Sequence, residues 1–161
     1  MTRFKETVYW ETSVWVAWMT DEQRPNHEMD GVLECVQKVE KGQIMLVTGQ
    51  SIIEMELLET TMSSEAQVKF NDLMKRRNCQ KLPFDPRLHD RVRQIREGCR
   101  QAGIVVPKVG DATHLAYAIH YSVDELHTFD EAHLLPLDGR PQVKELTIRK
   151  PPVTQYRIEY P

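Results

Sequence analysis

The chain has 161 residues, of which 40% are hydrophobic and 28% are charged, a balance typical of a globular protein with a sizeable core. Its formal net charge of −3 excludes a surface that attracts nucleic acid as a whole, so such binding would need a local basic patch. No apolar run approaches the roughly 20 residues of a transmembrane helix, and the first residues lack the apolar segment of a signal peptide. The 3 cysteines are widely spaced and form no Cys-x-x-Cys. We therefore expect one cytoplasmic domain without a membrane span, a disulfide framework or a zinc site.

Apolar runs of strand length alternate along the chain with longer segments of helical periodicity. The predicted strands cover 8–10, 44–47, 79–83 and 126–129, with a candidate last strand at 143–148, and the predicted helices cover 14–19, 29–40, 49–61, 64–77, 86–102 and 111–121. This alternation indicates an α/β domain with a central parallel sheet.

Polar residues and glycines at the ends of these segments predict where helices begin and end. Thr12 or Ser13 is expected to cap the first helix, because a hydroxyl oxygen can accept a hydrogen bond from a free backbone N–H. Ser64 is expected to cap the fourth helix in the same way, and Gly42 to end the second. The helix at 49–61 is so rich in Ile, Met and Leu that we expect it to expose little polar surface.

Four carboxylates occupy matching places in this alternation. Glu11 and Asp130 directly follow the first and fourth predicted strands, while Glu54 and Asp111 lie in the first turns of predicted helices. In a parallel α/β sheet these positions lie at one edge, at the carboxyl ends of the strands, where ligands bind. Four carboxylates in one cleft repel each other unless divalent cations neutralise them, and oxygen ligands without His or Cys select Mg²⁺ or Mn²⁺. Such ions suit phosphoryl chemistry.

Each acid also has an alternative role when it is taken alone. Glu11 fits a solvated loop, and Glu54 fits a surface position, as we expect for its neighbour Glu56. Asp111 fits a helix N-cap, and Asp130 fits a turn. The metal-site prediction therefore rests on the four acids together.

Four segments of the chain resemble motifs of the PIN-domain family, and most closely of its VapC-type toxin ribonucleases. Residues 8–14 are similar to the family's opening strand with an acid and Thr-Ser, 48–59 to its second-acid helix, 110–118 to its third-acid helix, and 126–134 to its strand-to-acid turn. The resemblance runs from about Thr7 to Leu135. The last two motifs are the more specific, because their order and spacing agree together.

The resemblance implies a PIN-like three-layer fold for 1–138, with helices flanking the sheet. Beyond it, 139–161 is a C-terminal extension in which 143–148 is the candidate last strand. The catalytic and metal-binding residues that it implies are Glu11, Glu54, Asp111 and Asp130. It further implies Mg²⁺ or Mn²⁺ as cofactor, cleavage of single-stranded RNA to leave a 5′-phosphate, and a cognate antitoxin as partner; a homodimer is compatible with it.

Three hydroxyl or carboxylate positions refine this expectation. Ser13 and Thr128 match hydroxyl positions of the family and are candidates for contact with metal-bound water or phosphate; capping or a strand-end role is the alternative. The family usually has Asp where this chain has Glu11, and the extra methylene moves the carboxylate oxygens by over ~1 Å, which Mg²⁺ tolerates poorly.

We therefore expect a metal-dependent endoribonuclease that is the toxin of a type II toxin–antitoxin pair. A PIN-fold RNA-processing nuclease is one alternative, and a catalytically weak PIN protein that binds RNA or a partner is the other. RNA-binding residues are not identified: Arg93, Arg96 and Arg100 share a helix face, but such a face is more often simply solvated. Trp15 and Trp18 share a face and fit either the core or a partner surface.

Overall fold

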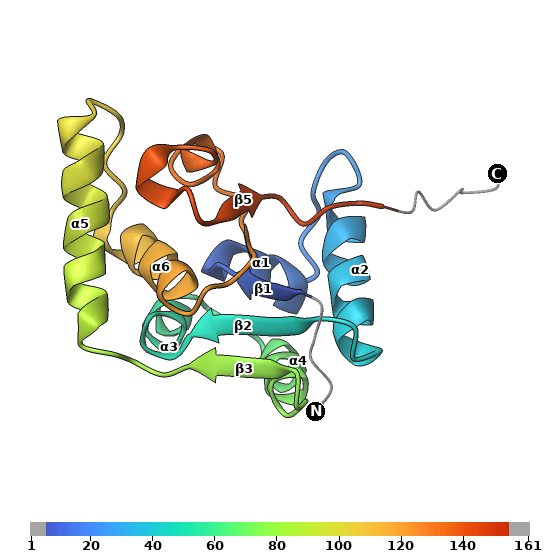
Figure 1. Cartoon of the computed structure of the whole chain (residues 1–161). Helices are drawn as coiled ribbons and strands as arrows, with labels where there is room; N and C mark the ends of the chain where they lie inside the picture. The colour runs from blue at the N-terminus through green and yellow to red at the C-terminus, as the bar shows by residue number, and fades with distance from the viewer. Residues whose placement is uncertain (1–5, 155–161) are drawn as a thin grey trace.

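A computed structural model describes residues 6–154, so the outer ends of the two predicted regions, 1–5 and 155–161, lie outside the described residues. The predicted α/β class is confirmed, because the strands form a single parallel sheet in the order β3-β2-β1-β4-β5 (Figure 1). Its strands are β1 (Thr7–Trp10), β2 (Met45–Gly49), β3 (Cys79–Leu82), β4 (Glu125–His127) and β5 (Thr147–Arg149).

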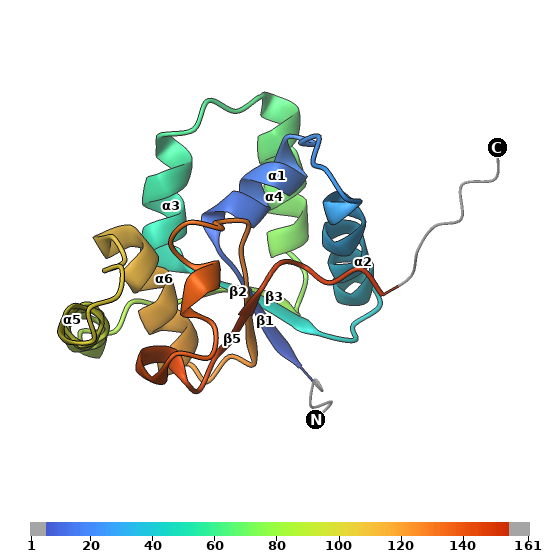
Figure 2. The same cartoon turned by 90° about the horizontal axis from the view of Figure 1, so that it is seen from above.

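Helices cover both faces of this sheet, as Figure 2 shows from above. The α-helices are α1 (Thr12–Met19), α2 (Glu28–Glu40), α3 (Gln50–Leu58), α4 (Ser64–Met74), α5 (Arg87–Gln101) and α6 (Val109–His120). Helices α1, α2 and α4 pack together on one face, and α5 packs against α6 on the other. Helix α3 contacts α1, α6 and β2, so it lies beside the ends of the strands.

Strand β1 shows why the chain forms two cores. Successive side chains of a strand point to opposite faces, and Val8 and Trp10 accordingly join the core under α1, α2 and α4, while Tyr9 joins the core under α5 and α6. Trp10 also packs edge-to-face against Trp15 at a ring distance of 4.9 Å, and both side chains are fully buried. Trp18 is also buried, so the predicted core role holds for these tryptophans.

Several helix ends differ from the prediction by one or two residues. Glu11, not Thr12 or Ser13, caps α1, because its carboxylate reaches the backbone N–H of Ser13 at 3.1 Å. Ser63 rather than Ser64 caps α4 through the N–H of Ala66.

Helices α2 and α3 test the remaining local expectations. Gly42 follows α2 with a φ of +68°, which glycine adopts without strain, as predicted. The expectation that α3 exposes little polar surface is wrong, because Gln50 and Glu54 are exposed; Ile53 is its one fully buried residue, and even Met55 and Leu58 are exposed. The helix is covered on one side only, because it lies at the edge of the domain.

The C-terminal part of the described chain is built onto the same sheet. Strand β5 pairs with β4 in parallel, with Leu126 opposite Ile148. It is shorter than the predicted strand at 143–148, because 3₁₀ turns at Leu135–Leu137 and Pro141–Val143 precede it. None of the helices in the described part of the chain has the length and apolar character needed to cross a membrane.

Candidate active site

The carboxyl ends of β1 and β4 lie side by side and place the first two acids. Trp10 is paired with His127 in the sheet, and the N–H of Glu11 donates to the carbonyl oxygen of His127 at 3.1 Å. Glu11 and Thr128 therefore leave the sheet next to each other, with Asp130 two residues further on. This is the edge at which parallel α/β sheets bind ligands.

Glu11 is buried and is held by three donors. Its Oε1 accepts the Ser13 N–H at 3.1 Å, and its Oε2 accepts the hydroxyls of Ser13 at 2.5 Å and Thr128 at 2.8 Å. A carboxylate offers about four acceptor sites, so the remaining one is on Oε1. Ser13 and Thr128 thus fix the orientation of Glu11, and Thr128 also accepts the N–H of Asp130 at 3.0 Å.

Asp111 is a half-buried carboxylate in the first turn of α6. The helix begins at Val109 with Lys108 as its N-cap, so Asp111 is not a capping residue. No residue of the described chain donates a hydrogen bond to its side chain. Burial and the negative charges of Asp130 and Glu11 raise the pKa of Asp111 to about 6. The charges around this carboxylate are therefore mainly negative, and the described chain gives it no hydrogen-bond donor.

Asp130 combines a turn with a free oxygen. Its Oδ1 accepts the backbone N–H groups of Ala132 at 3.1 Å and His133 at 2.9 Å, which is the predicted turn role. Its Oδ2 accepts no hydrogen bond from a described residue. Asp111, Asp130 and His133 each bring one possible ligand atom within 4.8 Å of the others. The turn and a ligand role are thus compatible.

Glu54 does not join these acids. Its Oε1 lies 3.0 Å from the Nζ of Lys81 on β3, and about half of its side chain is exposed. Within residues 6–154, no cluster of possible metal ligands includes it. Glu56 lies closer to the site, because its Oε1, Glu11 and His114 have possible ligand atoms within 4.8 Å of one another. The expectation that Glu56 is an ordinary surface acid is therefore wrong.

The predicted arginine face gives no separate site. Arg96 donates to the carbonyl oxygen of Pro107 at 3.0 Å, which ties α5 to the loop before α6. Arg93 and Arg100 form ion pairs with acids three residues earlier on the same helix. These side chains are engaged locally, which fits the solvated-face alternative.

The acids brought together fit a divalent cation. Asp111 and the Oδ2 of Asp130 are without donors in the described chain, and Glu11 keeps one acceptor site on Oε1. Unneutralised carboxylates this close raise one another's pKa, as Asp111 shows, and a cation would remove that penalty. The donor set is dominated by carboxylate oxygens, which suits Mg²⁺ or Mn²⁺.

Comparison with solved structures gives relatives with the same fold. VapBC2 from Rickettsia felis, bound to a DNA fragment from its promoter, matches with a TM-score of 0.64 at 15% identity, covering 89% of this chain and 98% of that one. FitAcB from Neisseria gonorrhoeae matches with a TM-score of 0.53 at 16% identity, covering 89% and 97%. FitAB bound to an IR36 DNA fragment gives 0.55 at 17% identity, covering 94% and 99%. At these identities the similarity shows the fold alone.

Sequence comparison identifies the family. No curated protein matches the chain. The family model of the PIN domain matches residues 8–135, which span the sheet from β1 to β4 and include Glu11, Asp111 and Asp130. Because this match covers most of the chain and the fold agrees with it, the protein belongs to the PIN-domain family.

Proposed function

We propose that the protein is a metal-dependent endoribonuclease that hydrolyses RNA phosphodiester bonds as the toxin of a type II toxin–antitoxin pair. The observation that carries the proposal is Asp111, a half-buried carboxylate with a raised pKa and no donor in the described chain, beside Asp130 and Glu11. Such a carboxylate is costly unless it binds a cation. Membership of the PIN-domain family supports nuclease chemistry at this place.

The side chains of the site would have different roles toward the cation. Asp111 and Asp130, which belong to one group of possible ligand atoms, would hold Mg²⁺ or Mn²⁺, and Glu11 of the second group would contribute its free Oε1. A bound ion of this kind activates water and stabilises the charge that develops on the displaced oxygen. Ser13 and Thr128 keep Glu11 in place, so they would act on the cation through its carboxylate.

The variant Asp130→Asn tests the catalytic part of the proposal. An amide can keep the turn at Ala132 and His133 but lacks the negative charge, so RNA cleavage should fall at least ~10-fold, which is about 1.4 kcal/mol of transition-state stabilisation. The loss should shrink at high Mn²⁺ concentration. Single-turnover cleavage of single-stranded RNA at two Mn²⁺ concentrations measures both effects.

Asp138→Asn is the matched control, because the Oδ1 of Asp138 also accepts a backbone N–H, that of Ile148, away from the site. It should cleave at the parent rate, and circular dichroism should show both variants folded. Parent-like cleavage by a folded Asp130→Asn protein would remove Asp130 from the site.

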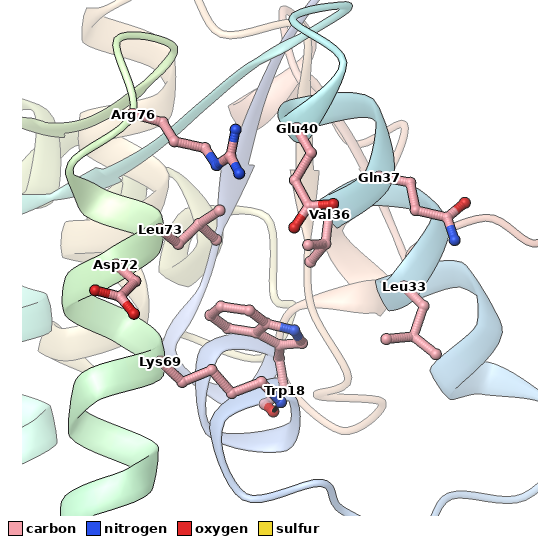
Figure 3. A pocket seen from close by; sticks show the side chains of 9 residues that line it. All are labelled: Trp18, Leu33, Val36, Gln37, Glu40, Lys69, Asp72, Leu73 and Arg76. Carbon is pink, nitrogen blue, oxygen red and sulfur yellow. Dashed lines mark hydrogen bonds between the residues drawn. The ribbon is translucent and has the colours of Figure 1, made fainter.

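The antitoxin part of the proposal needs a surface for a protein partner. A groove of about 470 Å³ lies between α1, α2 and α4, with Trp18, Leu33 and Leu73 on its apolar lining (Figure 3). Its charged lining is balanced, with Lys69 of α4 and Arg76 just beyond that helix set against Glu40 and Asp72. An apolar segment of the antitoxin that carries both acidic and basic side chains at its edges would fit this combination. Structural relatives solved as the complexes VapBC2 and FitAB support a two-protein system.

A charge introduced into the apolar lining of the groove tests this partner. Leu33→Glu should weaken binding of the protein encoded beside this chain, measured by calorimetry with the two purified proteins, by at least ~10-fold. Leu58→Glu, which places the same charge on an exposed position of α3, should leave binding unchanged. Equal affinities for both variants would exclude the groove.

The hydrogen bonds of Glu11 favour a second candidate, a catalytically weak PIN protein that binds RNA or its partner. Three of about four acceptor sites of this carboxylate are already occupied. Glu11→Asp separates the two functions: a rise in metal-dependent cleavage would identify an impaired catalyst, whereas no cleavage by either protein would identify a binding module.

A further inference from the structure

His114 of α6 is a fully buried polar side chain beside the acidic site. Its Nδ1 lies 2.7 Å from the hydroxyl of Tyr9 on β1, and its Nε2 lies 2.8 Å from Oε1 of Glu56 on α3. Thr12 also lies within hydrogen-bond distance of Nε2, at 3.1 Å. The imidazole therefore connects the sheet, α1 and α3 at one point.

The partner of Nε2 shows which way the hydrogen bond to Glu56 runs. The Nδ1 of His114 lies 2.7 Å from the Tyr9 hydroxyl, which also accepts the N–H of Gly49 at 2.9 Å. An ionised carboxylate only accepts hydrogen bonds, so in the 2.8 Å contact with Oε1 of Glu56 the Nε2 of His114 is the donor.

This donor holds Glu56 in place at the edge of the acidic site. The charge of Glu56 acts on Asp111, and its Oε1, which accepts from His114, lies 3.6 Å from where a Cβ on Gly110 would be. Glu56 is thus an acid held from behind by a buried donor.

We propose that His114 is a positioning residue that holds Glu56 at the cation site, so that Glu56 rather than Glu54 is the acid that α3 contributes. The inference deepens the proposed nuclease function and rests on it. Glu54 is instead neutralised by Lys81 at 3.0 Å. A histidine that hydrogen-bonds a carboxylate ligand fixes the direction in which that ligand faces the cation, and loss of such a partner typically costs 10–100-fold in metal affinity.

The competing explanation is that His114 is only a satisfied core histidine joining β1 to α6. Under that explanation a substitution lowers the stability of the fold but leaves the cation affinity of the folded protein unchanged. Under the proposal the affinity falls, and it falls because Glu56 is no longer held. Metal affinity measured on folded protein therefore separates the two roles.

The experiment measures the Kd of Mn²⁺ for the full chain by electron paramagnetic resonance of free Mn²⁺, without RNA. We expect Glu56→Gln to weaken binding at least ~10-fold and His114→Gln to weaken it by a similar factor. Glu54→Gln within α3 and Glu59→Gln at its C-cap remove the same charge, and both should stay within about 2-fold of the parent. A loss in Glu54→Gln with none in Glu56→Gln would overturn the assignment.

The double variant His114→Gln/Glu56→Gln tests whether His114 acts through Glu56. If it does, the double variant binds Mn²⁺ no more weakly than Glu56→Gln alone, because the two changes remove one interaction. Additive losses would overturn the positioning role. Should His114→Gln not fold, nitrogen NMR of the parent still tests the role: His114 must be protonated at Nε2, the atom that faces Glu56, and a ring bare at Nε2 overturns the proposal.

The outcomes also separate this inference from the proposed function. A parent protein that binds Mn²⁺ through Glu56 but cleaves no RNA would end the nuclease proposal and leave the inference intact. A parent that cleaves RNA while Glu56→Gln binds Mn²⁺ with the parent's affinity would overturn the inference and leave the nuclease proposal intact. A parent that binds no Mn²⁺ would overturn both.

Discussion

Asp111 is the residue at which stability and function are expected to conflict. Its pKa is raised to about 6 by burial and by the neighbouring carboxylates, so the folded protein holds this proton more tightly than the unfolded chain does. Well below pH 4 the group is protonated in both states and costs nothing. As the pH rises from about 4 to about 6 the unfolded chain releases this proton while the folded protein retains it, so stability is lost over that range and levels off above pH 6.

Asp111→Asn should therefore stabilise the cation-free protein at pH 7 and have little effect at pH 4. Each pKa unit is about 1.4 kcal/mol, but the carboxyl is part exposed, so solvent screening reduces the expected gain to about 1 kcal/mol, or roughly 2–4 °C in Tm. Thermal unfolding at both pH values, with and without Mn²⁺, measures this. Mn²⁺ should raise the Tm of the parent more than that of the variant. A Tm gain of the same size at pH 4 would mean that the charge is not the cause.

The residues of the site also show what the sequence can and cannot predict. Glu11 and Asp130 directly follow strands, and the carboxyl ends of all strands in a parallel sheet lie at the same edge. The prediction of these two strands therefore places both acids at that edge. Glu54 and Glu56 lie two residues apart on α3, and therefore about 200° apart around the helix. Because apolar residues surround both, the periodicity does not fix which one faces the site. His114 is what distinguishes the two acids: a buried histidine needs hydrogen-bond partners, and Glu56 is the acid of α3 that lies within reach of it.

At the scale of elements, the segment after β5 fixes α2 against the sheet. The chain at Pro151 passes directly over Gly31, where an added Cβ would lie 2.1 Å from the Pro151 carbonyl oxygen. Lys150 also reaches Glu28 of the same helix at 2.7 Å. Helix propensity alone would favour Ala at this position, so the glycine is explained by the close approach of two backbones.

Gly31→Ala should destabilise the protein by about 1–3 kcal/mol, because backbone cannot move aside as a side-chain end can. Gly98→Ala is the matched control in α5: its Cβ would meet only the Gln142 side chain at 3.1 Å, and the better helix propensity of Ala should make it neutral or stabilising by up to about 1 kcal/mol. Urea unfolding of both variants gives the comparison. Equal effects would show that α2 and the segment at 151 are not in firm contact.

Element types were predictable and element ends were not, for a physical reason. Strand length and helical periodicity are properties of several residues, and they place each α-helix and strand of the described chain to within about four residues, whereas the 3₁₀ turns at 135–137 and 141–143 were not predicted. A helix end depends on one hydrogen bond. Glu11 takes the cap of α1 from Thr12 and Ser13 because Ser13 and Thr128 orient its carboxylate from both sides of the chain.

At the scale of the whole molecule, the acids meet because β1 lies between β2 and β4 in the sheet. Glu11, Asp111 and Asp130 are far apart in the sequence and come from three different elements or their ends. Each is fixed by the packing of the entire domain. Patterns along the chain predicted the strand ends, while the register that brings Trp10 opposite His127 required the assembled sheet.

The region at 139–161 should therefore be needed for folding, rather than being an appendage to a nuclease domain at 1–138. Val143, Leu146 and Ile148 are buried in the core under α5 and α6, and each is worth roughly 1.5–3 kcal/mol. Together that is about 5–9 kcal/mol, comparable to the whole stability of a typical domain, about 5–15 kcal/mol. Removal of β5 also leaves the edge of β4 unpaired. We expect a chain of 1–138 to lack a cooperative thermal transition, while a chain of 1–154, which keeps the described C-terminal residues, unfolds near the Tm of the full protein. Cooperative unfolding of 1–138 near that Tm would show that the core closes without β5.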